Sequence, residues 1–146
     1  MSNKLEAFLT PDEEKAVIEA IRLAEKETSG EIRVHLEKST SLAAFDRAKE
    51  VFHLLQMDAT QLKNGVLIYV AVKDHQFVIL GDKGINDVVP ENFWDSTRAV
   101  MEAHFRHGDF GQGLIDGINK AGEQLVRHFP CADDDTDELT NEISKG

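Results

Sequence analysis

The sequence predicts an α/β protein built on a mixed β-sheet. Residues 66–72 are apolar at successive positions and rich in β-branched types, a pattern typical of a strand buried on both faces. The polar break Asp74-His75 and a second apolar run over residues 76–80 follow, and together they predict a hairpin with an antiparallel third strand. An alternating segment and a segment of helical spacing precede the buried run, so the chain order also predicts a strand–helix–strand unit.

The strand–helix–strand unit is expected over residues 31–72. In residues 31–37 every second residue is apolar, which predicts a strand whose other face is polar and exposed (Glu31, Arg33, His35 and Glu37). Apolar residues at helical spacing then predict a helix over about residues 45–57. We therefore expect residues 31–37 and 65–72 to pair in parallel, joined by a right-handed crossover.

A helix is expected before the first strand. Thr10 suits the capping position, Pro11 the first helical position, and Glu13 the acidic position of a capping box. Ser29-Gly30 predicts the end of this helix.

Two further helices are expected to complete a single domain over residues 1–130. Pro90 and Gly108 bracket the first, and Asp109 opens the second as its capping residue, with the helix running to about Phe129. Residues 131–146 carry six acidic residues and one basic residue with little apolar content, so we expect a disordered tail there.

The composition of the chain indicates which partners it can bind and in which compartment it is expected. The 146 residues carry a formal net charge of −11, which argues against a nucleic-acid partner because no phosphate-neutralising patch is in sight. The single cysteine, Cys131, excludes an intrachain disulfide. The first residues lack the apolar core of a secretory signal, and no window approaches the length of a membrane span. We expect a soluble, cytoplasmic protein.

The expected strand directions bring polar residues to one edge of the sheet. Glu31 and Asn64 stand where the two parallel strands begin, and Asp82 stands where the antiparallel third strand ends. Asp109 lies in a tight turn between helices and could reach the same edge. Oxygen ligands of this kind suit a hard cation such as Ca²⁺ or Mg²⁺, so Glu31, Asn64, Asp82 and Asp109 are the candidate metal ligands. Each acid also has a plain structural interpretation, as a helix cap, a turn residue or part of an exposed strand face.

Motifs of established chemistries are missing from the sequence. It contains no GxxxxGK[ST], no GxGxxG after a strand and no GxSxG. His104 and His107 have a spacing that can chelate a metal, but no third ligand stands at a fixed offset from them. The acidic run from Asp133 lacks the glycine and the final glutamate of an EF-hand loop. No catalytic residue can therefore be assigned from motifs.

Five segments of the chain have a familiar order and spacing: Leu9-Thr10-Pro11 with the helix that follows, Ser29-Gly30-Glu31-Ile32, residues 64–71, residues 81–90 and residues 106–114. They span roughly residues 9–129, and residues 108–114, GDFGQGL, are the most specific. In these segments the chain resembles the TPM domain family, whose founders include a thylakoid-lumen protein and a photosystem II repair factor. It shows neither the signal peptide nor the membrane anchor of many relatives, so we expect a stand-alone, soluble member.

The resemblance implies a three-layer α/β/α sandwich with a short mixed sheet, in agreement with a strand–helix–strand unit, a hairpin and two C-terminal helices. Members of the family have been associated with divalent-cation binding and with acid phosphatase activity. If these properties carry over, the matching acids are Glu31, Asp82 and Asp109, with Asn64 as a neighbour.

Three functions follow as hypotheses. The leading one is a domain that binds Ca²⁺ or Mg²⁺ at the acidic edge of the sheet. The second is metal-assisted hydrolysis of a phosphomonoester, with Arg33, Arg98 and Arg106 as the nearest candidates for contacting phosphate. The third is a non-enzymatic interaction module that binds a protein partner through the exposed strand face or the acidic tail.

Overall fold

The computed structural model describes residues 8–130 and 143–146. The helices and strands in these residues follow one another in a simple order. They are α2 (Pro11–Glu25), β1 (Glu31–Glu37), α3 (Ala44–Leu54), the 3-10 turn η1 (Met57–Ala59), β2 (Gly65–Ala71), β3 (Gln76–Gly81), α4 (Lys83–Asn86), α5 (Asp95–Arg106), α6 (Phe110–His128) and β4 (Ser144–Lys145).

The sheet has the strand order β3-β2-β1-β4. β1 and β2 pair in parallel from Glu31 opposite Gly65 to Glu37 opposite Ala71, and β3 returns antiparallel to β2. Every residue of β2 is buried. The predicted parallel pair, hairpin and fully buried central strand are therefore confirmed.

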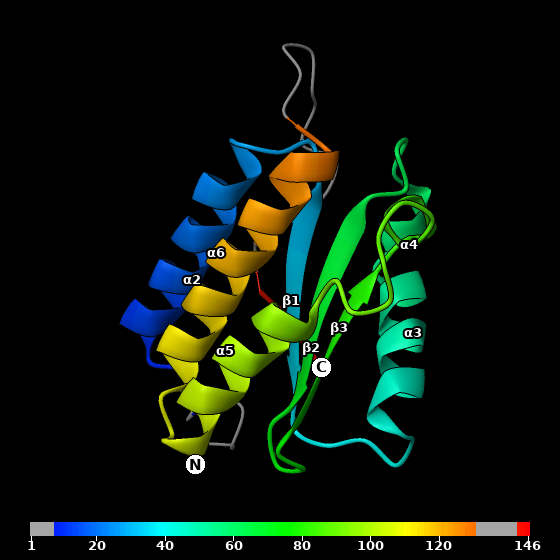
Figure 1. Ribbon diagram of the computed structural model, residues 1–146. Coiled ribbons are helices and arrows are strands. Elements are labelled where there is room, and N and C mark those ends of the chain that lie inside the picture. The colour runs from blue at the N-terminus through cyan, green and yellow to red at the C-terminus, as the bar shows by residue number, and fades with distance from the viewer. Residues whose placement is uncertain (1–7, 131–142) are drawn as a thin grey trace.

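Helices cover both faces of this sheet, which gives the predicted three-layer α/β/α arrangement (Figure 1). On one face α2, α5 and α6 pack against alternate residues of β1 and β2, and on the other face α3 packs against the remaining residues of β2. Burying both faces explains why β2 lacks the polar alternation of a half-exposed strand.

The start of α2 follows the sequence prediction closely. Thr10 accepts a hydrogen bond from the Glu13 N–H, and the Glu13 side chain accepts one from the Thr10 N–H, so both halves of the capping box are present. Pro11 occupies the first turn, where its missing N–H has no helical partner to lose. The helix ends at Glu25, a few residues before the predicted stop.

The polar face of β1 differs from its prediction, because it is buried. Glu31, His35 and Glu37 keep 4–5% of their surface exposed. Strands in a parallel pair are normally covered on both faces. Polar residues that alternate along such a strand are therefore buried, and they form hydrogen bonds inside the protein. The prediction of an exposed polar face on residues 31–37 was wrong for this reason.

The start of α5 and the cap of α6 also differ from the sequence prediction. The last turn before α5 is irregular, and α5 begins at Asp95 instead of at Pro90. Asp109 precedes α6 but its side chain makes no capping hydrogen bond, and its backbone is not extended (φ −95°, ψ 65°). Its carboxylate lies 3.8 Å from Nδ1 of His104, so it faces α5.

The C-terminal residues add a fourth strand. Ser144–Lys145 pair in parallel with His35 and Leu36 of β1, where the sequence predicted disorder. The rest of the predicted tail, residues 131–142, lies outside the described residues.

Candidate functional site

Three of the four predicted ligand residues meet at one edge of the sheet. The Glu31 N–H donates to the Asn64 carbonyl over 3.3 Å, and the Asp82 N–H donates to the Gly65 carbonyl over 2.9 Å. The first residues of β1 and β2 and the last residue of β3 therefore lie side by side. We call this edge, defined by Glu31, Asn64 and Asp82, the rim.

Glu31 and Asp82 stand in the same row across the rim. Gly65 of β2 pairs with Glu31 of β1 on one side and lies opposite Asp82 on the other. Residues in one row of a sheet share a face, so both carboxylates are directed to the face that α3 covers. Two strand spacings, roughly 10 Å, separate their Cα atoms, and Gly65 between them has no side chain to fill the gap.

The two carboxylate oxygens of Asp82 differ in their contacts within the described part of the chain. Oδ1 accepts a hydrogen bond from the Lys83 N–H over 2.7 Å and so caps α4. Oδ2 is buried and has no hydrogen-bond partner among the described residues. A buried carboxylate oxygen normally has a donor or a cation beside it, so Oδ2 is the oxygen of the rim that could contact a further group.

The loop that leads into β2 supplies further oxygen atoms. Asn64 is buried, with 2% of its surface exposed, and its Nδ2 donates to Ser29 Oγ over 3.3 Å. Thr60, earlier in the loop, is equally buried, and its Oγ1 has no hydrogen-bond partner in the described part of the chain. Carboxylate, amide, hydroxyl and carbonyl oxygens are the ligands that hard cations prefer.

Gly84 holds this loop against α4. A Cβ atom at residue 84 would lie 2.3 Å from the Leu62 carbonyl oxygen and 2.5 Å from the Lys63 carbonyl oxygen. Both are backbone atoms, which cannot rotate away as a side chain can. The close approach therefore requires glycine and fixes the distance between the loop and the end of β3.

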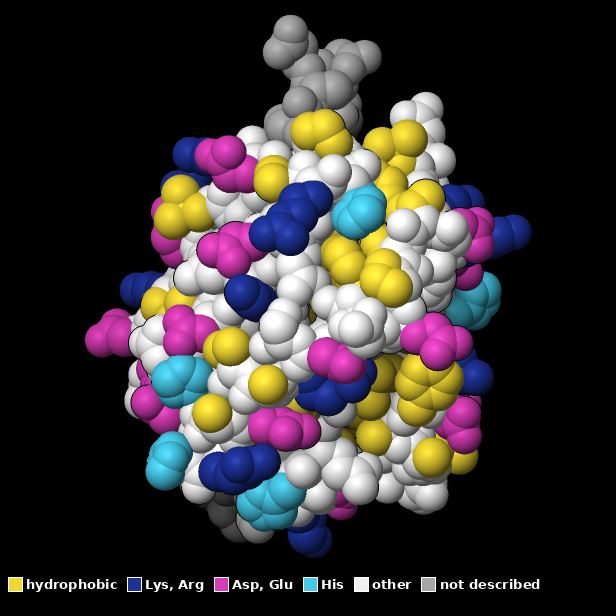
Figure 2. Space-filling model, viewed as in Figure 1, with side chains coloured by type: hydrophobic (Ala, Val, Ile, Leu, Met, Phe, Trp, Pro, Cys, Tyr) yellow, Lys and Arg dark blue, Asp and Glu magenta, His cyan; other side chains and the backbone are white. Residues whose placement is uncertain are grey.

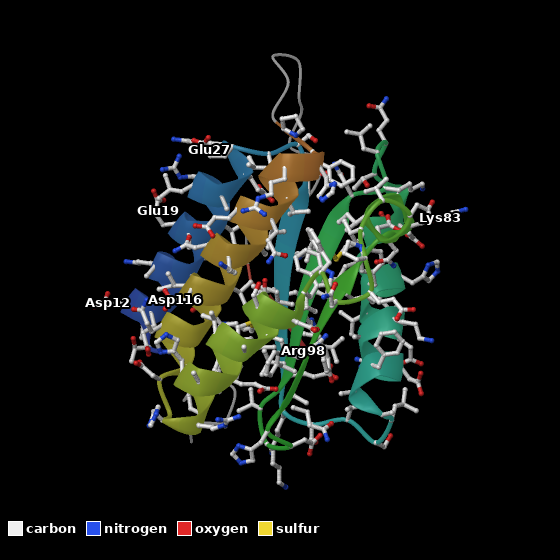
Figure 3. All side chains as sticks on the ribbon, viewed as in Figure 1. Asp12, Glu19, Glu27, Lys83, Arg98 and Asp116 are labelled. Atoms are coloured by element: carbon white, nitrogen blue, oxygen red, sulfur yellow. The ribbon has the colours of Figure 1, made fainter. Side chains whose placement is uncertain are left out.

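A small hollow of about 300 Å³ lies beside Asp82 on the α3 side. Lys49 and Lys83 line it together with Asp82 and Asn86. Lys83 extends from α4 into solvent in Figure 3. An ion at the rim would therefore have ammonium groups in its surroundings as well as carboxylates.

Asp109 lies at the other end of the molecule. α6 begins beside it and ends near the rim, where the Phe129 carbonyl accepts a hydrogen bond from the Ser29 N–H over 2.9 Å. A helix of this length spans roughly 28 Å, so Asp109 does not join Glu31, Asn64 and Asp82. Within residues 8–130 and 143–146, no group of three or more His, Cys, Asp and Glu side chains is placed to hold a metal ion.

His104, a weaker metal candidate, contacts two carboxylates. Its Nε2 lies 2.7 Å from Asp116 Oδ2 and its Nδ1 lies 3.8 Å from Asp109 Oδ2. These contacts join α5 to α6 at the end of the molecule opposite the rim.

A buried polar network on β1 was missed by the sequence interpretation. Glu37 accepts hydrogen bonds from Arg47 Nε (2.9 Å), Arg47 Nη2 (3.0 Å) and the Tyr69 hydroxyl, and His35 Nε2 lies 3.1 Å from its Oε1. His35 also contacts Ser144 Oγ over 2.9 Å, so the network reaches β4. We call Glu37, Arg47, Tyr69 and His35 the Glu37 network.

The Glu37 network perturbs the ionisation of its members. Burial alone would raise the pKa of Glu37, but the hydrogen bonds from Arg47, Tyr69 and His35 outweigh burial and lower that pKa to about 2. Burial and the adjacent Glu37 carboxylate raise the pKa of Tyr69. Burial lowers the pKa of His35, against the opposing effect of Glu37. The network therefore holds a carboxylate–guanidinium pair at neutral pH.

One signal in the sequence could have indicated this network. A strand that pairs in parallel is expected to be covered on both faces, so its alternating ionisable residues required internal partners. The identity of those partners is not visible locally, because Arg47 and Tyr69 are 10 and 32 residues away from Glu37.

The arginines proposed for phosphate binding are divided between the two ends of the molecule. Arg33 lies on β1 two residues after Glu31 and on the same face. Arg98 and Arg106 lie on α5 and line a cavity at the end opposite the rim.

Of the described helices, none combines the length and the apolar character needed to cross a membrane.

Comparison with known proteins gives a family and a fold. A family model described as the TPM domain matches residues 2–124. The BA42 protein of the psychrophilic bacterium Bizionia argentinensis is 62% identical, with each chain covered over 100% of its length and a TM-score of 0.93. None of the curated proteins matches the chain.

Two more distant structures share the fold. The N-terminal domain of a P. gingivalis protein is 18% identical and has a TM-score of 0.70, with 84% of this chain and 79% of that chain covered. The N-terminal domain of the cg2496 protein of Corynebacterium glutamicum is 11% identical and has a TM-score of 0.65, with 80% and 74% covered.

Proposed function

Because the chain belongs to the TPM domain family, we propose that it binds a divalent cation, Ca²⁺ or Mg²⁺, at the rim. The observation that carries the proposal is the buried Oδ2 of Asp82, which has no hydrogen-bond partner among the described residues. Glu31 in the same row would supply the second carboxylate.

The ligand set that we propose contains few protein carboxylates. Asp82 and Glu31 would each give one oxygen, Asn64 or a loop carbonyl would give another, and water would complete the shell. Mg²⁺ commonly keeps several waters and uses one or two carboxylates, whereas Ca²⁺ accepts carbonyl and water oxygens in a looser shell. Two carboxylates with Lys49 and Lys83 nearby favour weak binding that depends on cation concentration.

Asp109 is not part of the proposed site, since it lies at the opposite end of α6. Metal-assisted phosphomonoester hydrolysis is a second proposal, and it requires phosphate and metal at one place. Arg33 is the arginine that shares both the face and the end of Glu31, so hydrolysis at the rim would depend on Arg33.

The interaction-module alternative loses part of its basis. It relied on an exposed polar face of β1, and His35 and Glu37 on that face are buried. Its other element, the acidic segment 131–142, lies outside the described residues.

Cation titration of the full chain tests the proposal. Ca²⁺ and Mg²⁺ are added while backbone amide shifts are followed, and the residues around 31, 64 and 82 are expected to move. Asp82→Asn keeps the cap on α4, since asparagine caps as well as aspartate, but removes the charge, so affinity is expected to fall about tenfold. Asp95→Asn, at an exposed acid on α5, makes the same change of charge away from the rim and serves as the control.

Two outcomes would contradict the rim site. One is a response confined to the acidic segment 133–142. The other is an equal loss of affinity in Asp82→Asn and Asp95→Asn, which would show that cations respond only to the net charge of the chain.

A further inference from the structure

A second cavity lies at the end of the sheet opposite the rim. It has a volume of about 900 Å³ and is bounded by the carboxyl end of β2, the start of β3, α5 and the start of α6. Val70 and Ala71 at the end of β2, and Val72 directly after it, form one part of the lining. In open α/β sheets, ligands commonly bind outside the carboxyl ends of the parallel strands, which is where this cavity opens.

Aromatic rings form the apolar wall of this cavity. Phe8, Phe77, Phe105 and Phe110 all line it and contact one another. Phe8 stacks on Phe110 with ring centroids 4.4 Å apart, and Phe77 meets Phe105 edge to face at 5.3 Å. All but Phe8 remain half-buried, so their rings offer unused edges and faces to the cavity.

A stripe of charged side chains on α5 also borders this cavity. Arg98, Glu102 and Arg106 follow one another at intervals of four residues, so they share one stripe of the helix. All three line the cavity, and Figure 3 places Arg98 between α5 and the sheet. Basic and acidic groups border apolar ones over this region in Figure 2.

The arginines are held only weakly by their own helix. Arg98 Nη1 lies 3.5 Å from Asp95 Oδ1, and Arg106 Nη2 lies 3.5 Å from Glu102 Oε2. Both are long contacts between exposed side chains, and contacts of this kind contribute little to holding a guanidinium group in place. Their guanidinium groups therefore remain available to a ligand, and Arg98, which is 46% exposed, is the less solvated of the two.

The lining of the cavity is richer in basic groups than the chain as a whole. It contains two arginines and one glutamate, and Asp95 adjoins Arg98, whereas the chain carries a net charge of −11. The two guanidinium groups can pair with an anion, and the aromatic wall suits a flat apolar body.

We propose that this cavity binds a small aromatic anion whose carboxylate contacts Arg98 and whose ring packs against Phe77 and Phe105. Arg98 offers a planar pair of N–H donors that matches a carboxylate. The site is separate from the rim and does not depend on cation binding there.

Titration of the full chain with naphthalene-2-carboxylate tests the proposal, and uncharged naphthalene-2-methanol is the comparison ligand. Backbone amide shifts are expected at residues 70–77 and 98–110, and the carboxylate is expected to bind at least about tenfold more tightly than the alcohol. Arg98→Gln is expected to remove this preference. Arg127→Gln, at an exposed position on the far end of α6, makes the same change of charge and is expected to keep it.

A second variant tests the location without touching a charge. Gln76 is exposed, lines the cavity and lies on β3, where tryptophan is well tolerated, so Gln76→Trp is expected to fill the cavity and weaken both ligands several-fold. The proposal is overturned if acid and alcohol bind equally. It is also overturned if Arg98→Gln and Arg127→Gln behave alike, or if Gln76→Trp binds both ligands as the unchanged chain does.

Discussion

The Glu37 network makes a quantitative prediction about acid stability. Its carboxylate has a pKa of about 2 in the folded chain against an ordinary value of 4.5. Each unit of difference corresponds to about 1.4 kcal/mol, and Arg47 keeps 27% of its side chain exposed, so screening reduces the total to about 2 to 3 kcal/mol. We expect Glu37→Gln to lower the free energy of unfolding by this amount at pH 7.

The pH dependence follows from the direction of the shift. Because the folded pKa is lowered, the unfolded chain binds the extra proton first as the pH falls below 4.5. The contribution of Glu37 is therefore complete above pH 4.5, roughly halves by pH 3, and disappears below pH 2. The difference between the unchanged chain and Glu37→Gln should shrink over the same window.

Urea denaturation at pH 7, 4.5 and 3 measures this difference without adding salt. Glu50→Gln is the matched control, since Glu50 contacts the same Arg47 over 3.0 Å but is 53% exposed. It is expected to change the free energy of unfolding by less than about 0.5 kcal/mol. A Glu37→Gln difference that stays constant from pH 7 to pH 3 would refute the reasoning, because the lost stability would not come from the carboxylate charge.

Two further predictions concern the loop before β2 and the ring of His35. Gly84→Ala is expected to lower the free energy of unfolding by about 1–3 kcal/mol, because the added Cβ would meet the Leu62 and Lys63 carbonyl oxygens; an unchanged urea midpoint would show that the loop moves freely. The His35 ring is expected to titrate below 6.5 in an NMR pH titration, because burial lowers its pKa. A midpoint above 6.5 would mean that the Glu37 charge outweighs burial.

The sheet could be predicted from the sequence because its signals are local. The unbroken apolar run at residues 66–72 and the break at Asp74-His75 define β2 and the hairpin without reference to any other segment. Strand direction then sufficed to bring Glu31, Asn64 and Asp82 together, since parallel and antiparallel pairing determine which strand ends meet.

The Glu37 network and the place of Asp109 could not be predicted in the same way. The partners of Glu37 come from α3 and from β2, so their meeting depends on how the helix packs on the sheet. The sequence does not show in which direction α5 and α6 run across the sheet, because that direction depends on how the helices pack. The prediction could therefore not tell that Asp109, at the start of α6, lies far from the rim. The fourth strand, Ser144–Lys145, is too short to carry a periodic signal.

The opposite positions of the rim and the cavity limit the chemistry that the two can share. β1 and β2 pair over seven positions, from Glu31 opposite Gly65 to Glu37 opposite Ala71, which is a length of roughly 20 Å. A cation beside Asp82 therefore cannot polarise an anion held by Arg98. Metal-assisted hydrolysis would have to take place wholly at the rim, with Arg33 as the phosphate contact, while a ligand in the cavity would be bound without a metal. A substitution at Arg98 therefore changes the cavity alone and leaves Glu31, Asn64 and Asp82 at the rim unchanged.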